Sequence, residues 1–331
     1  MIMFVGCQAV TQGTPCMRQL PLAFAIFSLV LLFGCTGDND TLQVDFEKTI
    51  NVARPETDSG NRRRLKVAVA AMVSPKETFV YYREILQYLS EKLNREVQLV
   101  QRKTYGEINE LLGKGEIDLA FLCSGPYAAE KDKHGFELLA TPEINGSHFY
   151  QAYLIVNEKS EFNDLEDLRG KTFAFTDPDS NTGRLVPTFW LQERGETPET
   201  FFSQTIFTYS HDNSIMAVAK GMVDGAAVDG LIWEYFNATN PVVTSQTRII
   251  RKSDLYGIPP LVASSALSTA DKESTRKILF SAHEDPKGRQ ILDGLKIDRF
   301  IEPRDEWYDS IRAMIKGLHL HARQPDDHAK P

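Results

Sequence analysis

The sequence predicts an α/β protein with two lobes, each an open, mostly parallel sheet flanked by helices. Strand and helix patterns alternate from Leu65 onward, which is typical of parallel sheets covered by helices. A short internal repeat links two parts of the chain, because K-G-E-I-D-L-A at 114–120 matches K-G-M-V-D-G-A at 220–226. In each copy a glycine ends a helix and the chain turns into a strand. In open α/β sheets ligands bind beyond the carboxyl ends of the strands, so we expect the ligand crevice there.

The first set of elements lies between residues 65 and 122. Strands are expected at 65–71, 97–100 and 118–122, where short apolar runs are bounded by turn residues. Residues 79–93 carry apolar side chains at helical spacing and predict a helix. Thr104 and Glu107 have the spacing of a capping box, which predicts a second helix that ends at Gly113.

The second set begins near Tyr150. Strands are expected at 153–156, 172–176, 205–209 and 226–229, with helices between them that include 183–194 and 213–220. Farther on, 248–251 and 261–263 predict strands, and 269–283 and 306–318 predict helices.

The N-terminal segment predicts export and lipid attachment. Arg18 precedes an apolar run at 20–33, which is too short to span a bilayer as a stable helix. The run ends in L-F-G-C at 32–35, a lipobox pattern, so we expect a signal segment over 1–35 and lipidation at Cys35. Translation can start at Met1 or at Met17. An uncleaved anchor and a plain secretory peptide are the alternatives.

Two further segments are expected to lack a fold. Residues 36–61 are polar and aperiodic and predict a flexible tether, and residues 319–331 predict a disordered tail. Cys123 is the only other cysteine of the mature chain, so no intrachain disulfide can form if Cys35 is lipidated. The role of Cys123 itself stays open.

The net charge of −8 and the absence of a basic stripe argue against nucleic acid as a partner. The acidic balance does not exclude a buried anion site, since surface charges beyond a Debye length of roughly 8 Å are screened. No spacing of His, Cys, Asp and Glu suggests a metal site, so we expect no metal and no cofactor. We also expect a monomer.

The strongest functional signal is the segment K-T-F-A-F-T-D-P-D-S-N-T-G at 171–183. It predicts a buried strand that enters a polar loop at the N-terminus of a helix. Unpaired N–H groups, the helix dipole and the hydroxyls of Ser180 and Thr182 would then meet in one small volume, which suits a tetrahedral oxyanion. The alternative is that Ser180 or Thr182 merely caps the helix.

The chain resembles the phosphate-, phosphite- and phosphonate-binding receptors of ABC importers, which are type II periplasmic binding proteins. The resemblance runs from about Leu65 to Ala263 and rests on D-P-D-S-N-T-G at 177–183, on His211, and on A-K-G-M-V-D at 219–224 followed by Asp229. It implies a lipid-anchored receptor on the periplasmic side of a bacterial membrane, which captures a phosphorus oxyanion for an ABC permease.

The resemblance also implies how the chain is divided. Lobe 1 would comprise residues 62–148 and 248–318, and lobe 2 residues 149–247. The hinges would lie near 148–152 and 244–248.

In lobe 2 we expect Ser180, Asn181, Thr182, His211 and Asp229 to contact the ligand. The hydroxyls and His211 would donate hydrogen bonds, and Asn181 either adds an amide donor or points away. Asp229 would accept a proton from a P–OH group, which ionised sulfate lacks, so it would reject sulfate. His211 has an alternative role as a cap for the following helix.

Lobe 1 must supply the opposite wall of the site. Tyr105, Tyr127 and Tyr150 are the candidates, each able to donate a phenolic proton. For each of them core packing is the alternative.

Two other functions have to be considered. Ser180, His211 and Asp229 would suit a hydrolase, but the chain lacks a G-x-S-x-G elbow, and we expect that it is not an enzyme. A ligand-sensing input for a membrane kinase or cyclase would use the same fold and site, and the sequence does not separate it from transport.

Overall fold

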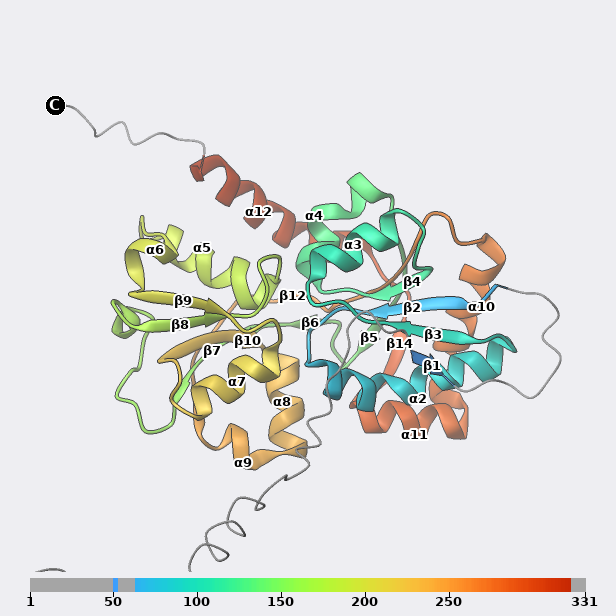
Figure 1. Cartoon of the computed structure of the whole chain (residues 1–331), viewed down its shortest axis with the longest axis horizontal. Coiled ribbons are helices and arrows are strands. Elements are labelled where there is room, and N and C mark those ends of the chain that lie inside the picture. The colour runs from blue at the N-terminus through green and yellow to red at the C-terminus, as the bar shows by residue number, and fades with distance from the viewer. Residues whose placement is uncertain (1–49, 53–62, 323–331) are drawn as a thin grey trace, which may run out of the picture. The chain divides into compact units, whose positions relative to one another are not determined.

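The computed structural model describes residues 50–52 and 63–322, which form two lobes, each a sheet with helices on both faces (Figure 1). In the described residues the lobe 1 sheet has seven strands, in the order β1 (Ile50–Val52), β3 (Val97–Val100), β2 (Leu65–Val69), β4 (Leu119–Phe121), β13 (Leu261–Ala263), β5 (Glu137–Glu143) and β14 (Arg299–Ile301). The lobe 2 sheet has the order β11 (Thr247–Lys252), β7 (Ala152–Asn157), β10 (Gly225–Asp229), β8 (Thr172–Phe175) and β9 (Gln204–Phe207).

Both sheets are mixed, so the expectation of mostly parallel sheets needs a correction. The neighbours β3, β2 and β4 are parallel, as are β10, β8 and β9, whereas β13 and β7 run antiparallel to both of their neighbours. Each of these two strands is the first long strand after the chain enters a lobe from the other. A strand that starts at the crevice must run away from it, opposite to strands whose carboxyl ends face the crevice.

The chain passes between the lobes along a short two-stranded ribbon, β6 (Phe149–Tyr150) paired with β12 (Tyr256–Gly257). The first crossing lies where it was expected, but the second lies later than 244–248. Residues 247–252 form β11, which pairs with β7 in lobe 2 rather than opening the return to lobe 1. The apolar pattern of this segment predicts a strand without saying which sheet it joins.

Helices cover both faces of each sheet. In lobe 1 they are α2 (Pro75–Leu93), α10 (Thr269–Phe280) and α11 (Pro286–Leu295) on one face, and α3 (Tyr105–Gly113) and α4 (Ser124–His134) on the other. In lobe 2 they are α5 (Val186–Gln192) and α6 (Pro198–Phe201) on one face, and α7 (His211–Ala219), α8 (Gly230–Thr239) and α9 (Pro241–Thr244) on the other. Helix α12 (Asp309–Ala322) packs against α4 and α5, and so against both lobes (Figure 1).

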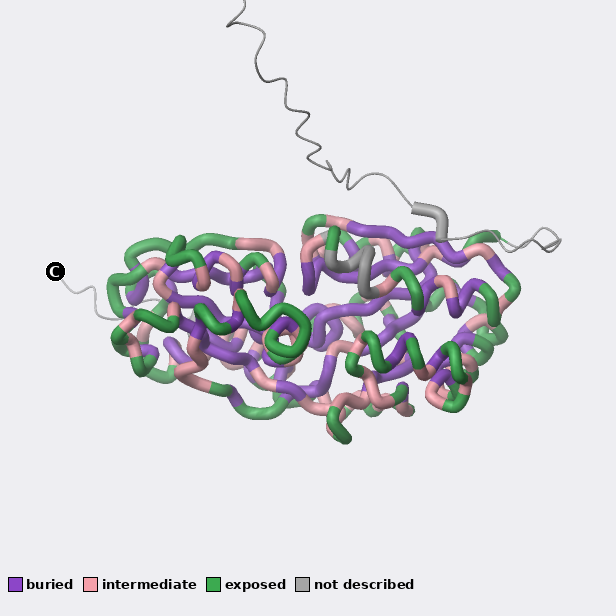
Figure 2. Tube along the Cα trace, turned by 90° about the horizontal axis from the view of Figure 1, so that it is seen from below, coloured by how far each residue is buried: buried purple, intermediate pink, exposed green. Residues whose placement is uncertain are grey.

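Strand β2 shows how the period of two in the sequence builds the core. Leu65, Val67 and Val69 pack into the apolar cluster that includes α2, whereas Ala68 packs into the cluster on the opposite face. The buried segments accordingly run through the interior of both lobes, with exposed residues concentrated outside them (Figure 2). Burial on both faces fixes the register of the strand ends that carry the site.

Most helices and strands with a clear periodicity of apolar residues lie where the sequence predicts them. Strand β3 has the expected bounds, and Thr104 and Glu107 make both hydrogen bonds of the capping box that opens α3. The sequence analysis missed α4, α8 and α11, whose first turns contain glycine, proline or bulky aromatic residues.

The terminal predictions fall largely outside the described residues: the signal segment 1–35, most of the tether 36–61, and the tail beyond 322. Two corrections arise at their margins. Residues 50–52 of the expected tether form β1, whose apolar-polar-apolar pattern is too short to stand out in the sequence. Helix α12 continues to Ala322 instead of stopping at 318, since no proline interrupts the chain before Pro325. Within the described part of the chain, no helix has the length and apolar character needed to cross a bilayer.

Candidate functional site

The donor loop, residues 176–183, connects β8 to the helix that follows. Ser180 is the N-cap of that helix, and its Oγ accepts a hydrogen bond from the N–H of Gly183 at 3.0 Å. The helix begins earlier than expected, with a π-helical turn over Asn181–Leu185 that leads into α5. Ser180 is therefore a cap, as the alternative interpretation holds, but its own hydroxyl proton is still available for a ligand.

Buried polar atoms without partners gather around this loop. Ten buried side-chain polar atoms in the described residues lack a hydrogen-bond partner. Half of them belong to residues at this one place: the Tyr105 hydroxyl, Thr176 Oγ1, Asn181 Oδ1, Thr182 Oγ1 and His211 Nε2. Because such groups are costly to bury, their concentration indicates a site built to bind something polar.

His211 and Asp229 lie side by side at the ends of adjoining elements of lobe 2. The backbone N–H of Asp229 donates to His211 Nδ1 at 3.0 Å, which places the proton of the neutral ring on Nε2. Burial lowers the pKa of His211 to about 3, so the ring is a neutral donor at physiological pH. His211 is also the first residue of α7, but the cap of that helix is Ser210.

Asp229 makes structural hydrogen bonds as well as belonging to the site. Its Oδ1 accepts from the N–H groups of Leu231 and Ile232, at 2.8 and 3.4 Å, and so caps α8. Burial raises the pKa of Asp229 to about 7, although these two hydrogen bonds act in the opposite direction. The carboxyl group can therefore accept or donate a proton near neutral pH.

Two of the three predicted tyrosines belong to this cluster, Tyr105 from lobe 1 and Tyr150 from the ribbon between the lobes. The Tyr150 hydroxyl lies 2.5 Å from Ser124 Oγ and accepts from Asn181 Nδ2 at 3.2 Å, which joins it to the donor loop. The Tyr105 hydroxyl is buried, and its pKa is raised first by burial and then by nearby groups that include Asp177 and Asp229. Burial likewise raises the pKa of Tyr150, so both phenols are neutral at physiological pH.

Tyr127 does not belong to this cluster, which corrects the prediction. Its hydroxyl donates to Asp305 Oδ1 at 2.6 Å, and its ring meets Tyr308 edge to face at 4.7 Å. It lies in α4, on the face turned toward α12 and the core. For this tyrosine the packing alternative is the right one.

The sequence analysis missed Asp177 and Ser124 as members of the site. Asp177 is buried, and its Oδ2 accepts from the N–H of Tyr105 in the other lobe at 3.1 Å. Burial raises the pKa of Asp177 to about 6. The D-P pair at 177–178 was a visible signal for it, since a strand that ends in aspartate at the crevice presents that carboxylate there.

The two lobes are in contact at the site. The N–H of His211 donates to the Met72 carbonyl at 2.9 Å, and the N–H of Ser74 donates to Asp212 Oδ1 at 2.7 Å. Gly125 of α4 approaches the donor loop so closely that a Cβ there would lie 2.6 Å from the Asp179 carbonyl oxygen. The structure therefore has the lobes closed on the site.

The three residues of the hydrolase hypothesis do not form a relay. His211 Nδ1 accepts from the backbone N–H of Asp229 and so does not donate to the Asp229 carboxylate, and Ser180 Oγ accepts from the backbone N–H of Gly183. A catalytic triad requires the carboxylate to orient the imidazole and the imidazole to bond the serine. Among the described residues, no cluster of three or more His, Cys, Asp or Glu is placed to hold a metal ion.

Comparison with known proteins gives a consistent family. The family of periplasmic substrate-binding proteins of phosphonate ABC transporters matches residues 67–308. The phosphate-import protein PhnD of Mycolicibacterium smegmatis is 28% identical over 199 residues, which cover 56% of this chain and 61% of that protein. The chain spans 61 to 63% of the length of the curated relatives it matches first.

Solved structures show the same fold. A binding-protein component of an ABC phosphonate transporter from Pseudomonas aeruginosa has a TM-score of 0.75 at 24% identity, covering 80% of this chain and 90% of its own. PhnD1 from Prochlorococcus marinus, in complex with methylphosphonate, has a TM-score of 0.71 at 21% identity, with 77% and 98% covered. The predicted two-lobed type II fold is thus confirmed.

The family match covers most of the chain, including the donor loop, the lobe 2 sheet and the lobe 1 sheet apart from β1 and the first two residues of β2. Its members are substrate-binding proteins, so the expectation that the chain is not an enzyme is confirmed. The chain belongs to the family of periplasmic substrate-binding proteins of phosphonate ABC transporters.

Proposed function

We propose that this protein is a lipid-anchored periplasmic receptor that captures a phosphorus oxyanion, namely a phosphonate, phosphite or phosphate, and delivers it to an ABC permease. One observation carries the proposal: buried polar atoms without partners gather around the donor loop in the described residues, and the buried carboxyl group of Asp229 belongs to a residue that contacts one of them, His211. The names of the relatives, one a phosphate importer and one a methylphosphonate complex, support this ligand class.

The donors have distinct roles in this proposal. Thr182 and Ser180 donate their hydroxyl protons to ligand oxygens, and His211 donates Nε2–H to another oxygen. Tyr105 donates from lobe 1. Because these groups are buried, each hydrogen bond to the charged ligand forms away from competing water.

Asp229 selects the ligand through a proton. An ionised Asp229 accepts from the P–OH of a singly charged phosphorus oxyanion, whereas it repels sulfate, which has no proton to give. Since the pKa of Asp229 is raised to about 7, the carboxyl group is ionised above that pH and neutral below it. A neutral Asp229 can donate to sulfate, so rejection of sulfate should weaken as the pH falls below 7.

The test is a thermal-shift series at pH 6 and pH 8 with methylphosphonate, phosphite, phosphate and sulfate at equal concentration. A phosphorus oxyanion at 100 times its dissociation constant should add about 2.7 kcal/mol to the free energy of unfolding. Sulfate should stabilise far less at pH 8, with a smaller difference at pH 6. Absence of any shift with all three phosphorus oxyanions would reject the proposal.

Asp229→Asn provides the matched variant. Asparagine retains an oxygen that can cap α8, so the fold should be preserved. The amide can also donate to sulfate at any pH, so the preference for phosphorus oxyanions and its pH dependence should both disappear. A variant that still rejects sulfate at pH 8 would assign selectivity to another group.

Lipid attachment at Cys35 is part of the proposal and rests on the L-F-G-C pattern at 32–35, outside the described residues. Cys35→Ser should move the protein from the membrane fraction to the soluble periplasmic fraction. Retention of the variant in the membrane would contradict the anchor.

A further inference from the structure

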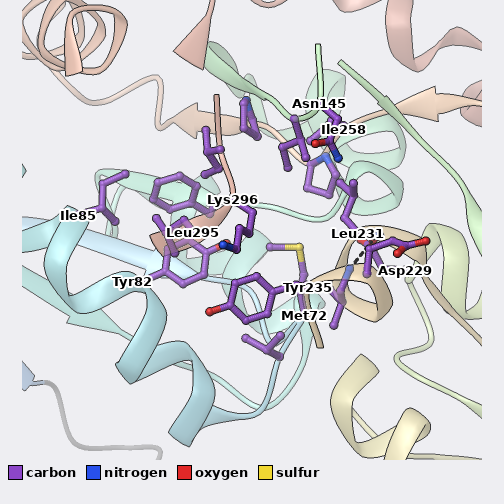
Figure 3. Close-up of a pocket in the computed structure, with 18 of the residues that line it drawn as sticks. Met72, Tyr82, Ile85, Asn145, Asp229, Leu231, Tyr235, Ile258, Leu295 and Lys296 are labelled. Carbon is purple, nitrogen blue, oxygen red and sulfur yellow. Dashed lines mark hydrogen bonds between the residues drawn. The ribbon is translucent and has the colours of Figure 1, made fainter. Parts of the chain in front are cut away.

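A cavity lies between the lobes, beside the donor cluster. It has a volume of about 380 Å³ and is bordered by α8 of lobe 2 and by α2, β4, β14 and the turn after α11 in lobe 1. Figure 3 shows Tyr82 and Ile85 on one side, Leu231 and Asp229 on the opposite side, and Met72 between them. We call it the interlobe pocket.

The wall of the interlobe pocket is mainly apolar. Its apolar residues come from both lobes and include Ile85, Phe121, Leu231, Ile232, Leu295 and Phe300. Of its charged residues, Glu234 and Lys296 are exposed, and Glu234 accepts a hydrogen bond from the Tyr153 hydroxyl at 3.1 Å. Asp229 is the charged group that is buried. The interior therefore suits an uncharged organic group.

Two residues join this pocket to the donor cluster. Asp229 borders the pocket and its backbone N–H bonds to His211, while Met72 borders the pocket and its carbonyl accepts from the N–H of His211. The charge of Asp229 also adds to burial in raising the pKa of Tyr82, across the pocket in lobe 1. Asp229 thus lies at the boundary between the donor cluster and the apolar wall of the interlobe pocket.

We infer that the interlobe pocket receives the organic substituent of the ligand, and that the preferred substrates are phosphonates with an uncharged apolar substituent of several carbons. The inference rests on the proposed function and narrows it, because phosphate and phosphite have no substituent to place there. The size is suitable: ligand pockets are roughly 300–1,000 Å³, and an apolar cavity of about 150 Å³ already holds benzene.

Three ligands test the inference with the full-length chain. Methylphosphonate leaves the pocket empty, n-butylphosphonate extends into it, and 3-aminopropylphosphonate has the same number of non-hydrogen atoms as the butyl compound but ends in an ammonium group. A buried methylene is worth roughly fourfold in affinity, so butylphosphonate should bind about 10- to 60-fold more tightly than methylphosphonate. The increase in affinity over methylphosphonate should be much smaller for the ammonium compound, 3-aminopropylphosphonate.

A variant tests whether the higher affinity for butylphosphonate arises in the interlobe pocket. Ala238 lies at the exposed end of α8 and lines the pocket, so Ala238→Trp should fold and obstruct it. The ratio of butylphosphonate affinity to methylphosphonate affinity should fall at least fivefold in this variant. The affinity for methylphosphonate itself should not change. Val242→Trp, at an exposed position in α9 that does not line the pocket, is the control and should change neither affinity.

Calorimetry gives a second measurement that does not depend on a variant. Burial of apolar surface makes the heat-capacity change of binding more negative, so the butyl ligand should show a larger negative value than the methyl ligand. If methylphosphonate, phosphite and phosphate all fail to bind, the proposed function itself fails. If methylphosphonate binds but butylphosphonate binds no better, or the ammonium compound binds best, the inference is overturned and the function stands.

Discussion

Thr182 is buried in the donor loop, yet its hydroxyl has no hydrogen-bond partner within the described residues. A buried unsatisfied hydroxyl costs about 1–3 kcal/mol, so a ligand that bonds to it recovers free energy that the unliganded fold gives up. The hydroxyls of a binding site can thus oppose stability and favour affinity at the same time.

Thr182→Val should separate these two effects. Valine keeps the shape and removes the hydroxyl, so affinity for a phosphorus oxyanion should fall roughly 10- to 150-fold while unliganded stability is unchanged or higher. Thr275→Val is the control, because Thr275 is also buried with an unpartnered hydroxyl but lies in α10 of lobe 1. Titration calorimetry and thermal unfolding on both variants decide the matter, and equal affinities in all three proteins would remove Thr182 from the site.

Site residues that lie in a continuous motif can be predicted from the sequence. Residues whose role depends on packing between distant segments cannot. Ser180, Asn181 and Thr182 follow a strand directly, so their location at the crevice is a local property. Tyr127 shares its residue type with Tyr105 and Tyr150, and only the packing of α4 against α12 turns it to Asp305. Asp177 was missed because its partner, the Tyr105 N–H, lies in the other lobe.

At the scale of elements, the contact between α4 and the donor loop controls how far the lobes can close. A Cβ at Gly125 would lie 2.6 Å from the Asp179 carbonyl oxygen and 2.9 Å from the Asn181 nitrogen. Both are backbone atoms, so the side chain cannot be accommodated by a small rotation. Glycine is required here by close approach rather than by backbone angle.

Gly125→Ala should therefore weaken ligand binding by tenfold or more without lowering the stability of the unliganded protein. The added methyl group opposes only the closed arrangement, and a loss of about 1.4 kcal/mol there is tenfold in affinity. Gly294→Ala, in α11, is the control, since its Cβ would meet no described atom within 4 Å. Calorimetry on the two variants should show a loss for the first alone.

The elements themselves were predictable to different degrees for physical reasons. Strand β3 and the capping box of α3 depend on residues adjacent in the sequence, and both were predicted. The edge that a strand pairs with depends on distant segments, so β11 was assigned to the wrong lobe. The prediction of parallel strands was wrong at β13 and β7 for a similar reason. The direction of a strand depends on the end of the sheet at which the chain enters the lobe.

For the whole molecule, the cluster is completed only when both lobes meet. Tyr105 approaches the donor loop from lobe 1 and Tyr150 from the crossing ribbon, while Thr182, His211 and Asp229 belong to lobe 2. A ligand can favour the closed form only through its greater affinity for that form. Small-angle scattering should therefore show a smaller radius of gyration when the full-length chain is saturated with methylphosphonate.

Two variants sharpen this measurement. Gly125→Ala should reduce the contraction, and Tyr150→Phe should weaken it at subsaturating ligand, because its hydroxyl links Ser124 to Asn181. Identical scattering with and without ligand at proven saturation would mean that the site is preformed, and the ribbon of β6 and β12 would then not act as a hinge.

Cys123, buried beside the donor loop, has a practical consequence. It is the sole cysteine after Cys35, and burial raises the pKa of its thiol to about 12, although the N–H groups of Asn181 and Gly125 lower it. Since thiolates are the reactive species, Cys123 will resist maleimide reagents. A single cysteine introduced at the exposed Val242 can thus carry a fluorescent dye with the native thiol left in place, which makes the chain a direct starting point for an optical assay of the proposed ligands.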